Sequence, residues 1–163
     1  MPDTKIGFGY DIHRLEAGRR LVLGGLEIPH PKGLAGHSDG DALVHALVDA
    51  LLGAMGEGDI GRLFPDADPR WKDARSVGFL EDVVGRLEAR GGEIINADTV
   101  IAAEEPKIAP HVAAMKAVLC PVLGIPEPAL GIKAKTAEGL GPVGEGRGIA
   151  CWAVVLVRFR PAE

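Results

Sequence analysis

The sequence predicts an α+β fold in which three main helices pack on one face of a single mixed β-sheet. The first observation behind this prediction is the order of the segments, because helix-like and strand-like patterns alternate after the first helix. The second is size and composition: the chain has 163 residues, of which 47% are hydrophobic and 25% charged. These values suit one globular domain. We therefore expect residues 1–163 to form a single domain.

Three segments have the apolar spacing of amphipathic helices. The first covers residues 39–56, with Ser38 as its expected N-cap and Asp41 as the acidic third residue of a capping box. The second covers residues 76–90 and ends at a pair of glycines. The third is expected to begin near Pro106, because proline is favoured in the first turn of a helix.

The strand candidates are short segments rich in β-branched and other apolar residues, namely residues 5–10, 21–23, 26–28, 93–103, 130–135 and 149–159. The last of them is apolar on both faces from Ile149 to Val157. A sheet with helices on one side shows polar alternation unless its other face is also covered. We therefore expect the second face of the sheet to be buried by other copies of the chain.

Charge and cysteine content exclude several classes of protein. There are 18 lysines and arginines against 23 aspartates and glutamates, a net charge of −5, which argues against a general nucleic-acid binder. The two cysteines form no CxxC motif, so a disulfide scaffold or structural zinc site is not expected. The longest apolar run is far shorter than the ~20 residues of a membrane helix. We expect a soluble, cytoplasmic protein that binds neither nucleic acid nor membrane.

The most informative polar residues predict a metal site. Asp11 and His13 are two residues apart, so in an extended segment they point to the same side. His45 lies on the first predicted helix, one turn from Asp41 and from Asp49, and either acid could accept the ring N–H that a metal does not use. Two nitrogens and one oxygen leave an open position, as in catalytic zinc sites, although Mn²⁺ or Co²⁺ would also fit. The alternative is an ordinary solvated helix face.

Two further polar segments are less specific. A glycine- and aspartate-rich stretch covers residues 58–68, a composition that binds sugar hydroxyls or metals but is also typical of turns. In the other segment, Thr136 offers a hydroxyl to a phosphate, Lys135 a positive charge, and Glu138 a hard oxygen for Mg²⁺. By itself that pattern is equally typical of a strand end followed by a turn.

Taken in order, these motifs make the chain resemble the 2-C-methyl-D-erythritol 2,4-cyclodiphosphate synthase family throughout its length. The most specific feature is HSDGD followed by a histidine at this spacing and then by GDIG-x-x-FPD. The matching segments are Asp11-Ile12-His13, Leu23-Gly24-Gly25, Lys32-Gly33-Leu34, His37-Ser38-Asp39-Gly40-Asp41, His45-Ala46-Leu47, Asp49-Ala50-Leu51-Leu52-Gly53, Gly58-Asp59-Ile60-Gly61, Leu63-Phe64-Pro65-Asp66, Pro106-Lys107, Lys133-Ala134, Thr136 and Glu138.

The resemblance implies a metal-dependent lyase of non-mevalonate isoprenoid precursor synthesis. Such an enzyme converts 4-diphosphocytidyl-2-C-methyl-D-erythritol 2-phosphate to 2-C-methyl-D-erythritol 2,4-cyclodiphosphate and releases CMP. The resemblance also implies a homotrimer with active sites between subunits. By motif matching, the zinc ligands would be Asp11, His13 and His45, and Glu138 would hold a second divalent ion, Mg²⁺ or Mn²⁺.

The remaining site residues are likewise carried over from the resemblance. His37 and Thr136 match positions that stabilise the transition state. The segments from Ala103 to Ala109 and from Lys135 to Glu138 match a cytidine-diphosphate pocket contributed across the subunit interface. The expected substrate contacts are Ser38, Asp59, Gly61, Phe64, Asp66, Asp68, Ala103, Pro106, Lys107, Ile108, Ala109 and Lys135.

The expected chemistry needs no nucleophile from the protein. The 2-phosphate of the substrate is largely dianionic at neutral pH, because the second pKa of a phosphate monoester is about 6. The protein would then hold two anionic groups in line and neutralise charge on the attacked phosphorus. Two alternatives remain open: a zinc phosphohydrolase that uses water as nucleophile, and a non-catalytic trimeric module that binds a metal or nucleotide.

The chain departs from the family pattern just before its last strand. Pro142 stands where relatives have an aromatic residue, and Glu145 and Arg147 are exchanged. Because these two lie two residues apart, a local acid–base pair could survive the exchange. The change leaves open whether the cavity on the trimer axis binds an anion. Ala137 replaces a frequent threonine, with little expected consequence.

Overall fold

The computed structural model describes residues 3–160, and its main sheet has five strands in the order β4-β1-β7-β5-β6. Residues 1–2 and 161–163 of the expected domain lie outside the described residues. β5 and β6 are parallel, whereas β1–β4, β1–β7 and β5–β7 are antiparallel, so the sheet is mixed as predicted. The strands are β1 (Asp3–Ala17), β4 (Lys32–Leu34), β5 (Gly92–Ala102), β6 (Leu130–Lys135) and β7 (Gly148–Phe159).

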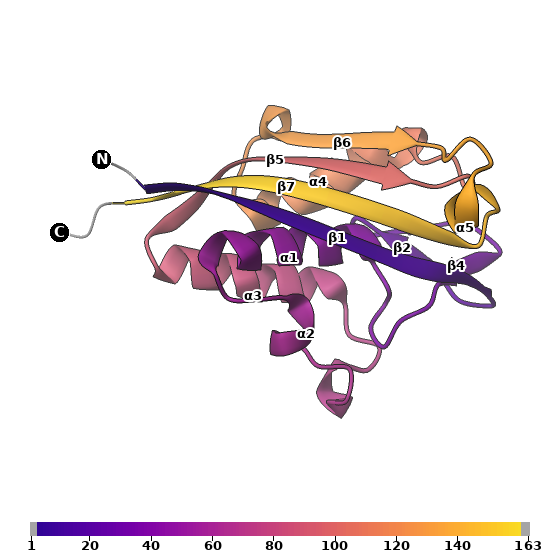
Figure 1. The fold of residues 1–163 in the computed structure, drawn as a ribbon, viewed down its shortest axis with the longest axis horizontal. Coiled ribbons are helices and arrows are strands. Elements are labelled where there is room, and N and C mark those ends of the chain that lie inside the picture. Colours follow the sequence, from indigo (N-terminus) through magenta and orange to yellow (C-terminus); the bar gives the residue numbers. More distant parts are fainter. Residues whose placement is uncertain (1–2, 161–163) are drawn as a thin grey trace.

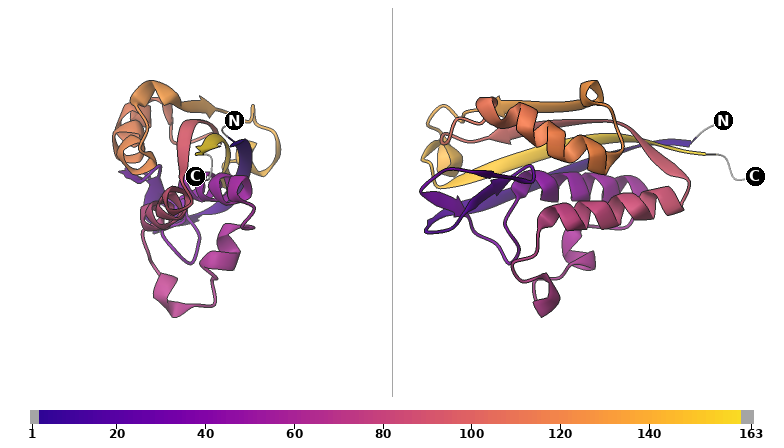
Figure 2. Two further views of the ribbon diagram at one scale, coloured as in Figure 1. Left: turned by 90° about the vertical axis from the view of Figure 1, so that its left-hand side faces the viewer. Right: turned by 180° about the vertical axis from the view of Figure 1, so that it is seen from behind.

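The three longest helices, α1 (Ala42–Met55), α3 (Ser76–Ala89) and α4 (Val112–Leu123), pack along one face of this sheet (Figures 1 and 2). This arrangement confirms the predicted fold class. α1 lies against β1 and β7, while α3 and α4 contact β5 and β6 respectively. The shorter elements are α2 (Ile60–Leu63), α5 (Gly141–Gly144) and 3₁₀ turns at Pro69–Trp71, Ala109–His111 and Glu127–Ala129.

Two predicted short strands do not join the main sheet. β2 (Leu21–Leu23) and β3 (Leu26–Ile28) pair with each other in a separate hairpin. The turn between them consists of two glycines in the left-handed region, Gly24 with φ 60° and Gly25 with φ 73°. These angles are typical of a tight two-residue hairpin turn, so β2 and β3 pair directly with each other.

Two glycines of β1 allow α1 to lie directly on the strand. A Cβ atom at Gly7 would stand 1.7 Å from the carbonyl oxygen of Ala50, and one at Gly9 would stand 1.9 Å from that of Ala46. Both distances are far inside van der Waals contact, so only glycine fits at these positions. This close approach brings His45, on α1, next to the strand that carries Asp11.

The predicted cap of the first helix is wrong. α1 begins at Ala42, and its N-cap is Asp41, whose carboxylate accepts a hydrogen bond from Val44 N at 3.1 Å. The same carboxylate also accepts from Gly24 N at 2.9 Å and Gly25 N at 2.6 Å. Because the β2–β3 turn supplies these extra donors, a buried aspartate is a better cap here than Ser38. Burial raises the pKa of Asp41, while the backbone N–H groups oppose that rise.

The third helix also begins later than predicted. α4 starts at Val112, after the 3₁₀ turn Ala109–His111, and Pro106 follows a cis peptide bond in the loop after β5. The first strand is longer than predicted, because β1 continues to Ala17 and carries Asp11 and His13 in regular pairing with β7. The second helix, by contrast, agrees closely with its prediction.

The face of β1 and β7 that lies away from the helices is apolar and exposed in the single chain. The residues concerned are between 41% and 70% exposed; they are Ile6, Phe8, Tyr10, Ile12 and Val154. Polar alternation is therefore missing on this face, as the sequence predicted. Among the helices of residues 3–160, none combines the length and the apolar character needed to cross a membrane.

Candidate functional site

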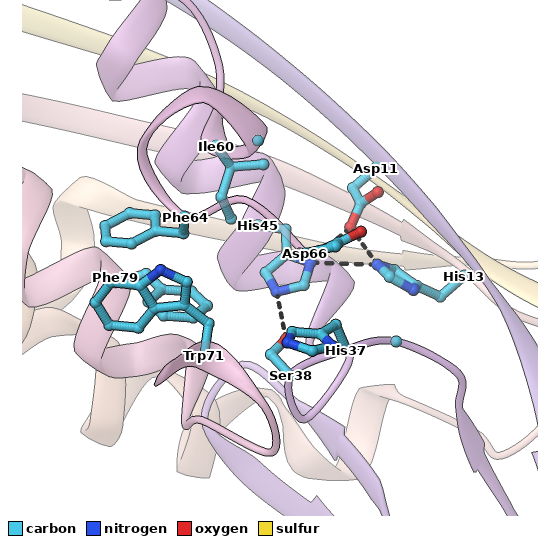
Figure 3. A pocket seen from close by; sticks show the side chains of 12 residues that line it. Asp11, His13, His37, Ser38, His45, Ile60, Phe64, Asp66, Trp71 and Phe79 are labelled. Atoms are coloured by element: carbon cyan, nitrogen blue, oxygen red, sulfur yellow. Dashed lines mark hydrogen bonds and ion pairs between the residues drawn. The ribbon is translucent and has the colours of Figure 1, made fainter. Parts of the chain in front are cut away.

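Three side chains from β1 and α1 converge on one point (Figure 3). Asp11 Oδ2 lies 2.8 Å from His13 Nε2 and 2.9 Å from His45 Nδ1, and the two ring nitrogens are 3.2 Å apart. The ligand atoms of all three residues lie within 4.8 Å of one another. The cluster predicted from the sequence is thus assembled within one chain, and it could hold a metal ion.

The chemistry of the donor set fits a divalent cation. His13 Nδ1 contacts the carbonyl oxygen of Ala35, which can only accept, so this nitrogen carries the ring proton and Nε2 is free to act as a ligand. His13 Nε2, His45 Nδ1 and the Asp11 carboxylate therefore point toward a common centre. Two imidazoles and one carboxylate with room for further ligands are typical of catalytic zinc and related metal sites.

The electrostatics of the cluster favour a cation as well. Burial raises the pKa of Asp11, but hydrogen bonds and charge from His13 and His45 outweigh burial and hold it well below its ordinary value. Burial lowers the pKa of His13, but the hydrogen bond and charge of Asp11 outweigh it, so the net shift is upward. The carboxylate thus stays ionised and attracts positive charge, whether a proton or a metal ion.

The expected partners of His45 are not those observed. Neither Asp41 nor Asp49 contacts the ring: Asp41 caps α1, and Asp49 accepts a hydrogen bond from Ile60 N at 2.7 Å. Instead, His45 Nε2 lies 2.8 Å from the hydroxyl of Ser76, at the start of α3. Sequence reasoning missed Ser76 because it comes 31 residues after His45 and is also an ordinary helix-start residue.

A cavity of about 210 Å³ opens beside the cluster. Its far wall is aromatic: the rings of Phe64 and Phe79 stack with centroids 4.4 Å apart, and Trp71 packs edge-on against both at 5.2 and 5.6 Å (Figure 3). Trp71 and Phe79 were not among the predicted site residues. Cavities with apolar walls and a few converging polar groups are typical of small-molecule sites.

Several predicted site residues line this cavity: the expected catalytic residue His37 and the expected substrate contacts Ser38, Gly61, Phe64 and Asp66. His37 Nε2 donates to the carbonyl oxygen of Asp68 at 3.2 Å, which connects the two loops that border the cavity. Asp59 and Asp68 are placed differently, because both cap short helical turns with their carboxylates. Asp68 also forms a 2.6 Å ion pair with Arg70.

The second group of predicted residues lies at the ends of β5 and β6. Ala103 N donates to Lys135 O at 2.9 Å, and Glu104 Oε1 accepts from Ala137 N at 2.7 Å. Thr136 Oγ1 donates to Glu138 Oε1 at 2.7 Å. The segment 103–109, which contains Ala103, Pro106, Lys107, Ile108 and Ala109, therefore adjoins the segment 135–138, as expected.

One chain does not bring the two groups together. Asp11 pairs with Cys151 on β7, Cys151 with Ile101 on β5, and Ile101 with Ala134 on β6. Neighbouring strands are roughly 4.8 Å apart, so three spacings separate Asp11 from β6 by about 14 Å. The cavity beside the metal cluster is lined by no residue of 103–109 or 135–138.

The exchanged residues near the last strand do form a pair. Arg147 Nε lies 2.7 Å from Glu145 Oε2, which confirms that an acid–base pair survives the exchange. Both side chains are more than half exposed in the single chain. Pro142 lies in the first turn of the short helix α5.

Comparison with known proteins gives a consistent result over nearly the whole chain. The YgbB family model matches residues 4–158. The 2-C-methyl-D-erythritol 2,4-cyclodiphosphate synthase of Gloeobacter violaceus is 54% identical over 155 residues, which cover 95% of both chains.

Solved structures agree with the sequence comparison. A structure of 2C-methyl-D-erythritol-2,4-cyclodiphosphate synthase is 48% identical, with a TM-score of 0.87 over 94% of this chain and 99% of that one. A CDP-bound form of this enzyme matches with the same TM-score and coverage at 47% identity. The chain therefore belongs to the YgbB family, as the 2-C-methyl-D-erythritol 2,4-cyclodiphosphate synthase motifs in its sequence indicated.

Proposed function

We propose that this protein is a 2-C-methyl-D-erythritol 2,4-cyclodiphosphate synthase. It converts 4-diphosphocytidyl-2-C-methyl-D-erythritol 2-phosphate to the cyclic diphosphate and CMP, within non-mevalonate isoprenoid precursor synthesis. The observation that carries the proposal is the convergence of Asp11, His13 and His45 beside a cavity. The names of relatives that match along the whole chain support it.

The reaction is an intramolecular phosphoryl transfer. An oxygen of the 2-phosphate forms a bond to the phosphorus on the erythritol 4-oxygen, and the bond from that phosphorus to the bridging oxygen breaks. CMP leaves with the bridging oxygen, so no protein nucleophile is needed. The protein's contribution is to hold both phosphates in line and to stabilise negative charge as it moves.

The proposed roles of the residues follow from their chemistry. Asp11, His13 and His45 hold Zn²⁺, or Mn²⁺ or Co²⁺, and Glu138 holds Mg²⁺ or Mn²⁺. When bound, these ions supply Lewis-acid stabilisation of phosphate oxygens. His37 and Thr136 donate hydrogen bonds to the phosphoryl group in the transition state, for which they exchange their acceptors in the single chain, Asp68 O and Glu138 Oε1, for phosphoryl oxygens.

The substrate contacts divide between the two groups of the site. Ser38, Gly61, Phe64 and Asp66, which line the cavity, bind the erythritol end. Asp59 and Asp68 are proposed contacts to the same end, although in the single chain their carboxylates cap short helical turns. The segments 103–109 and 135–138 bind the cytidine diphosphate, with Lys107 and Lys135 supplying positive charge. The CDP-bound relative supports a cytidine nucleotide as ligand.

We further propose that the working enzyme is a homotrimer of single-domain chains with active sites between subunits. Two observations support this assembly. The apolar face of β1 and β7 is exposed in one chain, and apolar patches of this kind are typical of interfaces. The two groups of site residues are also about three strand spacings apart, so a second chain is needed to bring them together.

The net charge of −5 supports the absence of nucleic-acid partners, and a charged substrate supports a cytoplasmic location.

Phosphorus NMR of the products tests the activity against its alternatives. The metal-loaded protein is mixed with the cytidine diphosphate substrate and Mg²⁺. Stoichiometric CMP and a cyclic diphosphate are expected. Linear phosphates would instead indicate a zinc phosphohydrolase, and no turnover in metal-replete protein would indicate a binding module.

A further inference from the structure

A buried chain of hydrogen bonds extends from the metal cluster into α3. Ser76 is fully buried, and His45 is 8% exposed. The Ser76 hydroxyl donates to Asp39 Oδ1, and Ser76 N donates to Asp39 Oδ2 at 3.0 Å. Asp39 lies in the loop before α1, and that loop is joined to the segment before α3 by the hydrogen bond from Asp39 N to Ala74 O. This chain of hydrogen bonds therefore links α1, the loop before α1 and the start of α3.

The direction of these hydrogen bonds is determined by their chemistry. A carboxylate only accepts hydrogen bonds, so the single hydroxyl hydrogen of Ser76 is directed to Asp39. The Ser76 oxygen can then only accept from His45 Nε2, which lies 2.8 Å away. The Ser38 hydroxyl is a more distant neighbour of the same nitrogen, at 3.3 Å.

This direction decides which His45 nitrogen is available to a metal. A neutral imidazole carries one N–H, so a hydrogen on Nε2 leaves the lone pair on Nδ1. Nδ1 is the nitrogen that lies 2.9 Å from Asp11 Oδ2 and 3.2 Å from His13 Nε2. Without an ion, a hydrogen on Nδ1 is donated to the Asp11 carboxylate, and a bound ion would take the place of that hydrogen. His13 is oriented by a backbone carbonyl, whereas His45 depends on two side chains that can be replaced.

We propose that Ser76 and Asp39 are positioning residues for the metal site, which hold His45 in the Nε2–H form with Nδ1 directed at the ion. This inference rests on the proposed metal binding by Asp11, His13 and His45. Neither residue touches the ion or the substrate in this scheme. Partners of this kind commonly change metal affinity by 10- to 100-fold when they are removed.

Two measurements on Ser76→Ala test the proposal. The first is the Zn²⁺ dissociation constant of the metal-free protein, measured by competition with a chelator. We expect it to rise 10- to 100-fold. The second is the nitrogen-15 NMR signature of the His45 ring in the Zn²⁺-loaded protein, which shows which ring nitrogen binds the ion and which carries hydrogen. We expect Nδ1 on the ion and hydrogen on Nε2 in the unmodified protein, and a mixture of Nδ1-bound and Nε2-bound rings in the variant.

Thr99→Val is the matched control. Thr99 is 1% exposed, and its hydroxyl donates to Gly131 O at 2.9 Å on β6, so this variant also removes a buried hydroxyl. We expect its Zn²⁺ affinity to stay within about twofold of the unmodified protein, because the lost contact does not involve a metal ligand. An equal loss in both variants would mean that Ser76 acts only through general stability, and would overturn the proposal.

Asp39→Asn covers the case in which Ser76→Ala does not fold. It preserves an acceptor oxygen but weakens the charge-assisted bond, so we expect a smaller loss of about three- to tenfold in affinity. Unchanged affinity and an unchanged tautomer in the folded variants would refute the positioning role. A protein that binds no Zn²⁺ but keeps a hydrogen on His45 Nε2 that is protected from exchange by Ser76 would refute the proposed metal binding while leaving the hydrogen-bond chain intact.

Discussion

The two groups of the proposed active site are constructed very differently. The metal cluster is enclosed between β1 and α1, its side chains are largely buried, and each histidine ring also contacts a second partner. The segments proposed to bind the nucleotide, residues 103–109 and 135–138, lie at the end of the sheet. They are held mainly by backbone contacts, and Thr136 and Glu138 are exposed.

This difference indicates which group one chain can complete by itself. A buried cluster with oriented ligands is preorganised, so it can bind an ion without rearrangement. The exposed loop pair follows β5 and β6, the latter about 14 Å from Asp11, and it contributes no residue to the cavity beside the cluster. Metal affinity should therefore depend on the single chain, whereas turnover should depend also on the assembly.

The largest effect is expected for His45→Ala, which removes one of the three ligands. Turnover should fall by roughly 10³-fold or more and Zn²⁺ binding should be lost, because two ligands hold zinc poorly. The proposed trimer should persist, since His45 lies on the helix side of the sheet. Product formation, bound zinc and sedimentation are measured together. His30→Ala, in an exposed loop, is the control, and retention of both zinc and activity in His45→Ala would contradict the ligand assignment.

Phe8→Glu tests the proposed trimer, because a charge on the apolar face should separate the chains that bring the two groups of the site together. Phe8 is 63% exposed on the apolar face, and a charge there opposes burial between subunits. We expect monomers in sedimentation experiments and a loss of roughly 100-fold in turnover, if each site needs two chains. Zn²⁺ affinity should remain within a few-fold. A monomer with full activity would show that one chain completes the site.

Gly9→Ala tests whether the close contact between β1 and α1 is needed for the cluster. Its Cβ would stand 1.9 Å from the carbonyl oxygen of Ala46, so the helix must shift. We expect the free energy of unfolding to fall by about 3 kcal/mol and Zn²⁺ affinity to fall with it. Gly53→Ala is the matched control, because its nearest neighbour would be 3.8 Å away. That variant should gain up to about 1 kcal/mol from helix propensity.

Thr136→Ala acts on the exposed group alone. Removing its hydroxyl should lower kcat by roughly 10- to 100-fold if it stabilises the transition state, as expected for the loss of one hydrogen bond to a charged group, worth about 1.5–3 kcal/mol. Zn²⁺ affinity at the buried cluster should not change, since Thr136 is not one of the three residues that form it. Steady-state kinetics and chelator competition measure the two effects. A parallel loss of zinc would mean that the two groups are coupled.

The smallest effect is expected for Arg70→Ala, in the exposed turn Pro69–Trp71. The Arg70 guanidinium lowers the pKa of the Asp68 carboxyl below its ordinary value of 3.8, so the variant should raise that pKa. A carboxyl group whose pKa is lower in the folded than in the unfolded protein stabilises the fold at pH values above its unfolded pKa. This stabilisation is lost as the pH falls through the folded pKa. NMR titration of Asp68 measures the shift. Because this pair is exposed, stability at neutral pH should change little.

The sequence predicted best those features that depend on short-range patterns. The second helix agrees because its apolar spacing and terminal glycines are local signals. Asp11 and His13 were placed on one side because side chains alternate along a strand. The elements that were missed or shifted, such as α2 and the start of α4, depend on contacts with residues that are distant in the sequence. Asp41 became the cap of α1 because Gly24 and Gly25 supply two more donors.

By itself, the sequence determined the family, the fold class and the identity of the three candidate metal ligands, because local spacing and motif order carry that information. Only the tertiary structure decided that Ser76, rather than Asp41 or Asp49, contacts the His45 ring. The tertiary structure also decided that segments 103–109 and 135–138 lie apart from the Asp11, His13 and His45 cluster within one chain. Both depend on contacts between segments far apart in sequence, since helix packing and strand order bring together residues that no local pattern connects.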